Sequence, residues 1–436
     1  MTTTKNNEHK KLNFSNEREQ SQACLNSAEH EKNQGRKVLN VPNLRFPEFQ
    51  GEWVRMRLDA FTERVMRKNK NNKSKLPLTI SAQYGLVDQI TFFNKVIAST
   101  DMSNYYLLKK GEFAYNKSYS SDYPWGAVKR LDNYEQGALS SLYICFAPQD
   151  NVVSDFILQY FESPKWHKGV SEIAVEGARN HGLLNVSVQD FFHTYHYVPK
   201  DKKEQIKVAK LLMLLDERIA TQNKIIDKLQ SLIKGIMVEL QKQGVNKGTW
   251  KKVFLSDVLT ERNERNTNLF QVFSVSVSQG VVNQVDYLGR SFAAKDTSKY
   301  NVVHYGDLVY TKSPTGSFPY GIVKQSLSLE NVAVSPLYGV YKPKSLAVGA
   351  YLHEYFMSEI NTHNYLHPLI QKGAKNTINI TNQRFLENCV LLPTNINELL
   401  QISKLLRSLS NKMTCQQDIL QQYQKQKQYL LRQMFI

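Results

Sequence analysis

The sequence has few cysteines, and their spacing is unlike that of a disulfide framework or a zinc site. Cys24, Cys145, Cys389 and Cys415 are scattered along 436 residues, and none forms a CxxC pair. No apolar run approaches the roughly 20 residues that span a bilayer, and the first residues lack the apolar core of a signal peptide. These absences predict a cytoplasmic protein with reduced thiols.

Several catalytic motifs are also absent. The sequence has no Pro-Pro pair, whereas an adenine methyltransferase needs Asn/Asp-Pro-Pro-Tyr/Phe to hold the target amine, and no glycine is followed by the lysine of a P-loop. The pairs His193/His196 and His363/His367 lack the glutamate that follows the first histidine of an HEXXH zinc motif. We therefore predict no catalytic or metal-binding residue, while a nuclease carboxylate pair stays open.

Acidic residues are outnumbered by basic ones. The 39 Asp and Glu stand against 56 Lys and Arg, which gives a net charge of +17 and a pI near 9.4. This balance favours a polyanionic partner such as nucleic acid over an anionic membrane surface. A chain of 436 residues is also too long for one ordinary hydrophobic core, so two domains or more are expected.

The first 40 residues are rich in Asn, Gln, Glu, Lys and Ser and have few large apolar side chains. Such a segment cannot bury enough surface to offset its ordering entropy, so we predict a disordered tail. Order should begin near LRFPEFQGEW (44–53), where large apolar residues first gather.

One phrase occurs in each half of the chain. KGEFAYNKS (110–118) reappears as YGDLVYTKS (305–313) at an offset of 195. Further segments match in the same order with little drift: ISAQYGLVDQ (80–89) with VSVSQGVVNQ (275–284), DYPWGAVK (122–129) with SFPYGIVK (317–324), and EGARN (176–180) with KGAKN (372–376). The order of these matches predicts a duplication. Two copies are too few for a solenoid.

Short β-branched and aromatic runs in each copy, bounded by Gly or Pro, predict strands. DFILQYFES (155–163) and AYLHEYFMSEI (350–360) have apolar residues at helical spacing. Each copy is therefore expected to be a mixed α+β domain. The strand order does not follow from the sequence.

A long helix is predicted after each copy. Asp201 with Glu204, and Asn395 with Glu398, resemble capping boxes at the two helix starts. Gly244 and Gly248 are expected to stop the first helix. Both helices carry an a/d heptad seam, built around Leu212, Leu215, Ile219, Gln222, Ile226, Leu229 and Ile233 in the first and Leu406, Leu409, Met413, Gln416, Leu420 and Tyr423 in the second. Lys427 interrupts the second seam, which should be looser there.

A narrow a/d stripe favours a helix partner over a domain surface, and the nearest partner is the other copy. We expect an antiparallel coiled coil between two related globular domains, with pseudo-two-fold symmetry. Two separate amphipathic helices, each lying on its own domain, are the alternative. The predicted boundaries are a tail (1–40), a first domain (41–200), a central helix (201–244), a second domain (245–393) and a C-terminal helix (394–436).

This arrangement resembles the DNA specificity subunit of Type I restriction-modification systems over about residues 41–436. The matching pieces are the LRFPEFQGEW lead-in, the repeated G-[ED]-[FL]-[AV]-Y-x-K-S phrase, the GARN and GAKN loops, and the two helices. The resemblance implies two target recognition domains that each read one part of an interrupted site on double-stranded DNA. It also implies two methyltransferase subunits bound about the helices, and restriction and translocase subunits in the full complex. S-adenosylmethionine, ATP and Mg²⁺ would belong to those partners.

Candidate DNA-binding residues follow from comparing the copies, because phosphate contacts position a protein while base contacts specify the sequence. Residues shared by the copies suit phosphate contacts or structural roles: Lys117 with Lys312, Lys129 with Lys324, Arg179 with Lys375, and Asn180 with Asn376. Residues in the differing loops are candidates for reading bases, against the alternative of merely variable loops: Ser118, Tyr119, Ser120 and Trp125, and Ser313, Thr315 and Tyr320.

The sequence thus predicts a non-catalytic subunit that recognises a bipartite DNA site and scaffolds its partners. The alternative is a stand-alone restriction endonuclease or another basic DNA-binding scaffold with duplicated domains. Neither the DNA sequence recognised nor its spacer follows from these residues.

Overall fold

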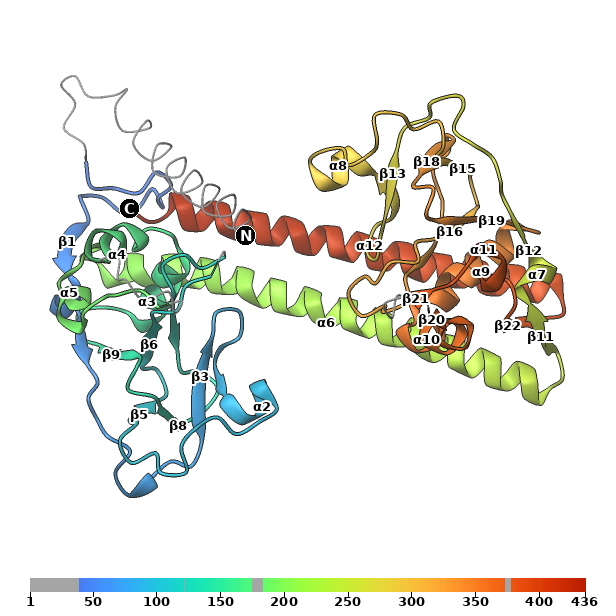
Figure 1. Ribbon diagram of the computed structural model, residues 1–436. Coiled ribbons are helices and arrows are strands. Elements are labelled where there is room, and N and C mark those ends of the chain that lie inside the picture. Colours follow the sequence, from blue (N-terminus) through green and yellow to red (C-terminus); the bar gives the residue numbers. More distant parts are fainter. Residues whose placement is uncertain (1–38, 121, 175–182, 373–377) are drawn as a thin grey trace, which may run out of the picture. The chain divides into compact units, whose positions relative to one another are not determined.

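The computed structural model describes residues 39–120, 122–174, 183–372 and 378–436. Contacts divide the chain into two compact units. Unit 1 runs to Asp216 and takes in Lys425–Ile436, and unit 2 is Glu217–Gln424. Two long helices, α6 (Lys202–Asn246) and α12 (Ile396–Gln433), therefore each contribute to both units (Figure 1). The predicted mixed α/β fold with two long helices is confirmed.

Unit 1 contains a four-stranded sheet of order β2-β9-β6-β7, another of order β4-β3-β8-β5, and the pair β1-β10. All neighbours are antiparallel except β3 and β8, which are parallel. The strands are β1 (Val54–Arg57), β2 (Thr62–Arg64), β3 (Pro77–Ser81), β4 (Gly85–Asp88), β5 (Tyr106–Lys109), β6 (Phe113–Asn116), β7 (Ala127–Arg130), β8 (Gln136–Leu139), β9 (Ile144–Pro148) and β10 (Tyr195–Val198).

Helices of unit 1 enclose an aromatic core with its sheets. Helix α3 contributes Phe156, Tyr160 and Phe161 to this core, where they pack with Trp166 and Phe191. The helical elements are η1 (Leu58–Ala60), η2 (Lys70–Asn72), α2 (Gln89–Phe93), α3 (Ser154–Glu162), α4 (His167–Ile173) and α5 (Val188–His193). The helix predicted from DFILQYFES is therefore confirmed as α3.

Unit 2 repeats this plan. Its four-stranded sheet has the order β12-β19-β16-β17, and its two-stranded sheets are β11-β22, β13-β14, β15-β18 and β20-β21. The strands are β11 (Trp250–Phe254), β12 (Leu259–Glu261), β13 (Phe273–Ser276), β14 (Gly280–Asn283), β15 (Asn301–Val303), β16 (Leu308–Tyr310), β17 (Val323–Gln325), β18 (Val332–Val334), β19 (Gly339–Pro343), β20 (Gln371–Lys372), β21 (Ile378–Asn379) and β22 (Cys389–Pro393).

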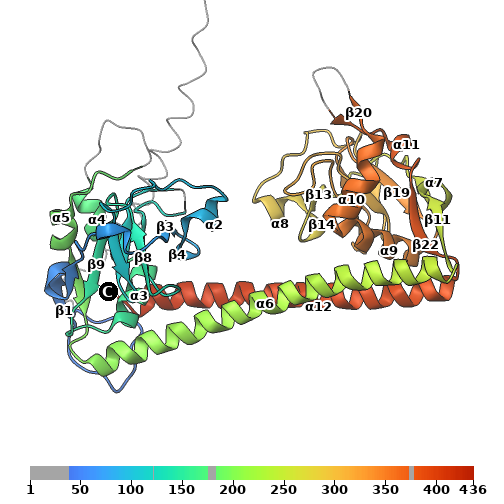
Figure 2. The ribbon, with the colours of Figure 1, turned by 90° about the horizontal axis from the view of Figure 1, so that it is seen from below.

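The helices of unit 2 occupy the corresponding places along the chain, and its core gathers Tyr310, Tyr341, Phe356, Tyr365 and Phe385. Figure 2 shows α2 beside β3 and β4 in unit 1, and α8 beside β13 and β14 in unit 2. The helices are α7 (Leu255–Val258), α8 (Gln284–Leu288), α9 (Leu346–Met357), α10 (Glu359–Leu366), η3 (His367–Leu369) and α11 (Asn382–Phe385).

Residues that pair between strands in unit 1 have counterparts, 195 residues later, that pair in unit 2. Phe113 pairs with Arg130 in β6–β7, and Leu308 pairs with Gln325 in β16–β17. The parallel pairing of Pro77 with Ala138 has its counterpart in an isolated parallel bridge between Val272 and Ala333. The equal strand order of the sheets β2-β9-β6-β7 and β12-β19-β16-β17, together with the equal register, confirms the duplication that the sequence predicts.

In unit 2 the two long helices are antiparallel. Gln222 donates from Nε2 to Oε1 of Gln416 at 2.6 Å, while Ile233 and Met237, later in α6, share a core with Leu399, earlier in α12. The reversed order fixes the direction. The seam residues Gln222, Ile226, Leu229 and Ile233 are all buried, so the predicted heptad face is confirmed here.

In unit 1 the start of α6 packs with the end of α12. Val208 and Leu212 share the core with Leu431 and Met434. Lys427, which interrupts the predicted seam, forms an ion pair with Asp216, whose other carboxylate oxygen accepts from Gln159 Nε2 at 2.9 Å; a looser seam here stays a prediction. A charge that breaks the heptad pattern is thus matched by a charge on α6.

The helix starts differ in part from capping boxes. The Asp201 side chain accepts from the backbone N–H of Lys203 at 2.8 Å, as an N-cap should. Glu204 does not reach back to the N-cap. Its buried carboxylate instead accepts from Trp53 Nε1 at 3.1 Å and pairs with the Arg45 guanidinium at 2.7 Å.

The second long helix starts in the same way. Asn395 caps the backbone N–H of Asn397 at 2.8 Å, and Glu398 accepts from Trp250 Nε1 at 2.8 Å. The glutamates therefore tie each helix to the first strand region of a unit.

The first helix runs two residues beyond its predicted end. Gly244 lies inside α6, and a Cβ there would come within 1.9 Å of the Trp250 ring, so this glycine permits close packing and does not stop the helix. Gly248, with a φ of 68°, does lie at the end of α6. The backbone N–H of Thr249 reaches back to the Gly244 carbonyl at 2.9 Å, as in a Schellman motif.

Candidate nucleic-acid interface

The repeated phrase forms a tight turn between two strands. In unit 1 it joins β5 to β6, and Gly111 has a φ of 86°, which glycine adopts without a Cβ penalty. The buried carboxylate of Glu112 accepts from the backbone N–H of Lys109 at 2.8 Å and pairs with Arg67 at 2.8 Å. The first part of the phrase is therefore structural.

Unit 2 builds the same turn with an aspartate. Gly306 has a φ of 90°, and Asp307 accepts from the backbone N–H of His304 at 2.9 Å. Arg262 pairs with Asp307 at 2.6 Å, as Arg67 pairs with Glu112 in unit 1, although the two arginines stand at different register positions. Replacement of Glu by Asp thus keeps the ion pair and the turn.

The second part of the phrase anchors the following loop. Tyr115 is buried, and its hydroxyl donates to the Trp125 carbonyl at 2.9 Å; Tyr310 donates likewise to the Tyr320 carbonyl at 2.7 Å. Burial raises the pKa of both phenols, which keeps them neutral donors. Each tyrosine therefore fixes both ends of the loop that carries the candidate base-reading residues.

Glycines at the loop ends allow the chain to approach itself closely. A Cβ on Gly126 would lie 2.1 Å from the Asn116 carbonyl oxygen, and one on Gly321 would lie 2.8 Å from the Lys312 backbone nitrogen. Both glycines have positive φ. The two loops are thus held at their bases in the same way, and their differing tips extend from a common frame.

Candidate base-reading residues of unit 1 lie on the loop between β6 and β7. Ser118, Tyr119 and Ser120 are exposed, whereas Trp125 and Lys117 are half-buried. Lys117 lines a cavity of about 250 Å³ together with Asn116, Ser118, Leu142 and Arg64, and Ser118 pairs with Leu183 in an isolated bridge. The exposed serines and tyrosine present hydroxyls that can donate or accept at a base edge.

In unit 2 the corresponding loop lies between β16 and β17. Ser313 is exposed, and Thr315 and Tyr320 are half-buried. Lys312 takes a left-handed φ of 61°, and burial lowers the pKa of its ammonium while the nearby Glu261 carboxylate acts in the opposite direction. The loop therefore combines an exposed hydroxyl with a partly shielded cation.

Two of the predicted phosphate-binding lysines are buried. Lys129 pairs with Glu162 at 2.5 Å, and Lys324 donates to the Val277 carbonyl at 2.6 Å. Burial lowers the pKa of Lys324 to about 8. These contacts favour the structural role that the sequence left open for this pair. The candidates Arg179, Asn180, Lys375 and Asn376 lie outside the described residues.

A basic segment that the sequence analysis passed over follows β2. RVMRKNKNNKSK (64–75) contains six Lys or Arg and no Asp or Glu within twelve residues. Apart from Arg67, which pairs with Glu112, its cations are exposed. The charge run itself is the signal in the sequence, and a comparison of the two copies does not bring it out because the second copy lacks it.

An exposed apolar surface recurs in both units on the short helices. Its members stand at the constant offset of 195 and are 40–50% exposed: Ile90, Phe92 and Phe93 on α2, and Val285, Tyr287 and Leu288 on α8. Because both units present similar side chains, this surface does not fit a role in discriminating two different half-sites.

Of the two histidine pairs, only His196 is part of the buried core, whereas His193, His363 and His367 are exposed. His196 is buried between Tyr160 and Thr194, and burial lowers its pKa to about 3. His363 and His367 stack with ring centroids 5.1 Å apart. Over the described ranges, no group of three or more His, Cys, Asp and Glu side chains is placed to hold a metal ion.

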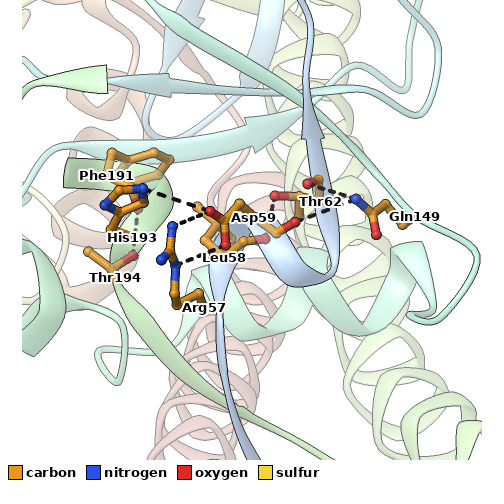
Figure 3. Close-up of polar contacts among 8 residues, drawn as sticks. All are labelled: Arg57, Leu58, Asp59, Thr62, Gln149, Phe191, His193 and Thr194. Atoms are coloured by element: carbon orange, nitrogen blue, oxygen red, sulfur yellow. Dashed lines mark hydrogen bonds and ion pairs between the residues drawn. The ribbon is translucent and has the colours of Figure 1, made fainter. Parts of the chain in front are cut away.

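Within these pairs, His193 faces a carboxylate. In Figure 3, His193 and Arg57 both point to Asp59, at 3.9 Å from the His193 Nε2 and 2.5 Å from an Arg57 Nη. Gln149 donates to the Thr62 carbonyl at 3.2 Å, and the Leu58 N–H donates to the Thr194 carbonyl at 2.9 Å. The cluster links η1 to α5 and to the segment after β9. These contacts indicate a structural role.

None of the helices in the described part of the chain has the length and apolar character that a bilayer crossing requires.

No model of a protein family matches the sequence, and no curated protein matches it. Among solved structures, the S subunit of the Type I restriction-modification system from M. genitalium is similar with a TM-score of 0.57 and 11% identity, over 91% of this chain and 99% of that chain. A structure on complex assembly and conformational transition of the type I R-M system has a TM-score of 0.44 and 13% identity, over 87% and 96% of the two chains. The HsdS subunit from Thermoanaerobacter tengcongensis has a TM-score of 0.37 and 13% identity, over 88% and 96%. The first comparison shows that this chain has the fold of a Type I restriction-modification S subunit.

Proposed function

We propose that the chain is the DNA specificity subunit of a Type I restriction-modification complex. The observation that carries this proposal is the duplicated unit, with equal strand order and register, on a pair of long helices. The fold likeness to the S subunit from M. genitalium supports it. A chain with two related readers is suited to a site with two half-sites.

Recognition is assigned to the differing loop tips on a common frame. Tyr115 and Tyr310 hold equivalent loops by the same hydrogen bond, so the loops are placed alike while their exposed residues differ. Rigid supports keep polar groups at fixed positions, which base discrimination requires. Ser118, Tyr119 and Ser120 would read one half-site and Ser313 and Thr315 the other.

The chain itself would be non-catalytic and would act as a scaffold. Two methyltransferase subunits would bind about the helices, and restriction and translocase subunits would join the full complex. S-adenosylmethionine, ATP and Mg²⁺ would be held by those partners. The absence of Pro-Pro and Gly-Lys from the sequence supports the assignment of methyl transfer and ATP use to other chains.

The competing function is a stand-alone restriction endonuclease. We would incubate the purified chain with Mg²⁺ and mixed-sequence DNA, alone and together with a candidate partner methyltransferase subunit. The proposal predicts no cleavage by the chain alone, and methylation only when both proteins are present. Cleavage by the chain alone, lost on addition of a chelator, would support the endonuclease instead.

A further inference from the structure

A buried asparagine closes the segment between β2 and β3 in unit 1 and the segment between β12 and β13 in unit 2. Asn69 and Asn266 are both fully buried. The Asn69 Oδ1 accepts from the backbone N–H of Ser74 at 2.8 Å, and the Asn266 Oδ1 accepts from that of Phe270 at 2.7 Å. An equivalent side chain thus closes an equivalent loop.

The loops differ in what they expose. In unit 1 the residues after Asn69 are KNNKSK (70–75), and in unit 2 the residues after Asn266 are TNLF (267–270). Lys70, Lys73 and Lys75 are exposed, and no ion pair involves them within the described residues. The unit 2 loop has no charged residue. The two copies therefore share the asparagine that closes the loop but differ in the charge of the loop residues.

The loop of unit 1 is held in a defined conformation. Asn71 and Asn72 take left-handed φ values of 57° and 51°, a region that asparagine tolerates better than most residues. The Asn72 Oδ1 accepts from the backbone N–H of Met102 at 2.9 Å. An acidic residue, Asp101, directly precedes Met102 in the sequence and so lies beside this contact. The lysines are thus presented from a fixed backbone.

Neighbouring cations extend this surface. Arg64 is exposed at the end of β2, and Lys68 donates to the Asn104 carbonyl at 2.8 Å with its ammonium 4.3 Å from the centre of the Tyr106 ring. Unit 2 has Glu261 in the place of Arg64 at the end of its strand β12. The Arg64 position therefore carries opposite charge in the two units, whereas the Lys68 position keeps a cation in unit 2, Arg265.

We propose that Arg64, Lys68, Lys70, Lys73 and Lys75, here called the basic loop, bind the phosphate backbone of double-stranded DNA. Unit 1 then supplies more of the electrostatic, sequence-independent affinity than unit 2. The inference rests on the proposed DNA-binding function and adds an asymmetry between the two readers. Lysine ammonium groups act as point charges suited to phosphates, and each neutralised phosphate releases condensed counterions.

The test measures how DNA affinity changes with salt. We would form the complex with its methyltransferase subunits and compare wild type with the triple variant Lys70→Gln, Lys73→Gln and Lys75→Gln. Each phosphate contact contributes about 0.9 to the slope of log affinity against log salt concentration. Loss of up to three contacts should make the slope shallower by about 2 to 3. Affinity for specific and for unrelated DNA should fall together.

A matched control removes three exposed lysines from unit 2. Lys251 and Lys252 on β11 and Lys342 on β19 are exposed and lie outside the basic loop. Their replacement by glutamine should change the slope by less than 1 on the same scale. The thermal midpoints of both triple variants should stay close to that of wild type, because none of the six side chains is buried.

The outcomes separate the inference from the function. Equal slopes of log affinity against log salt concentration for the two triple variants would contradict phosphate binding by the basic loop, while DNA recognition by the complex would still stand. A changed base preference in the Lys70, Lys73 and Lys75 variant would overturn the phosphate assignment. A wild-type complex that binds no DNA would overturn the proposed function and the basic loop with it.

Discussion

His196 gives unit 1 a pH dependence that follows from its burial. Its ring lies between Tyr160 and Thr194, at 2.9 Å and 2.8 Å from their hydroxyl oxygens, and its pKa is lowered from 6.5 to about 3. The unfolded chain therefore binds a proton below pH 6.5 that the folded chain does not bind. Stability is lost as pH falls from about 6.5 toward 3, by about 1.4 kcal/mol per pH unit for one such group.

The check is urea unfolding of wild type and His196→Gln at pH 7.5, 6.0 and 5.0. The variant should be less stable at pH 7.5, because it loses a packed ring, but its stability should fall less steeply with acid. His167, whose pKa burial lowers to about 4, leaves a residual slope in unit 1. His193→Gln, a change at an exposed ring, serves as the comparison variant. An unchanged slope in His196→Gln would contradict the account.

Residue roles were predicted only where they depend on local sequence. Gly111 and Tyr115 recur at a fixed offset, and the structure gives both a role in the turn and loop. Lys129 and Lys324 recur equally well but are buried, because their strands face helices that are distant in sequence. One sequence does not show which face of a short strand is covered, so phosphate contacts and structural contacts could not be separated.

At the scale of elements, two glycines of α6 should respond in opposite directions to the same change. A Cβ at Gly235 would meet nothing within 4 Å, whereas one at Gly244 would meet the Trp250 ring at 1.9 Å. Gly235→Ala should stabilise the protein by about 0.5 to 1 kcal/mol through helix propensity. Gly244→Ala should destabilise it by about 1 to 3 kcal/mol, because the helix or the indole must shift. Chemical denaturation of both variants gives the comparison, and equal effects would contradict the packing role of Gly244.

The amide pair of the helix seam should behave as a coupled unit. Gln222 and Gln416 are linked at 2.6 Å, and Gln222 is buried. Replacing either one by leucine leaves the other amide without its partner, at a cost of about 1 kcal/mol or more. Replacing both should recover stability, with a coupling energy of about 0.5 to 3 kcal/mol in a double-mutant cycle. Additive effects of the two changes would show that the pair has no specific role.

The long helices were the easiest elements to predict, because their apolar residues repeat over several heptads. The heptad seam through Leu212 and Ile226 indicates a helix with a helix partner, and both residues are buried. The end of α6 was misplaced because glycine is common at helix ends, while the contact that explains Gly244 is made by Trp250 in the following strand. The match of Lys427 with Asp216 also required knowledge of the pairing register.

At the scale of the whole molecule, the offset of 195 residues was sufficient to predict two related domains, since equal spacing of many matches requires a common fold. Strand order was beyond reach, because β6 lies between β9 and β7 through pairings that are distant in sequence. The pseudo-two-fold arrangement of the two units stays a prediction.

The central claim is that each unit reads its own half of an interrupted DNA site. The most direct measurement is a genome-wide map of methylated bases in cells that carry the chain and its partner methyltransferase, for wild type and for a chimera. In the chimera, residues 50–199 are replaced by the equivalent domain of a relative. The account predicts a two-part motif with a fixed gap for wild type. In the chimera one half should change while the other half stays the same. A single continuous motif, or a change in both halves, would contradict independent reading by the two units.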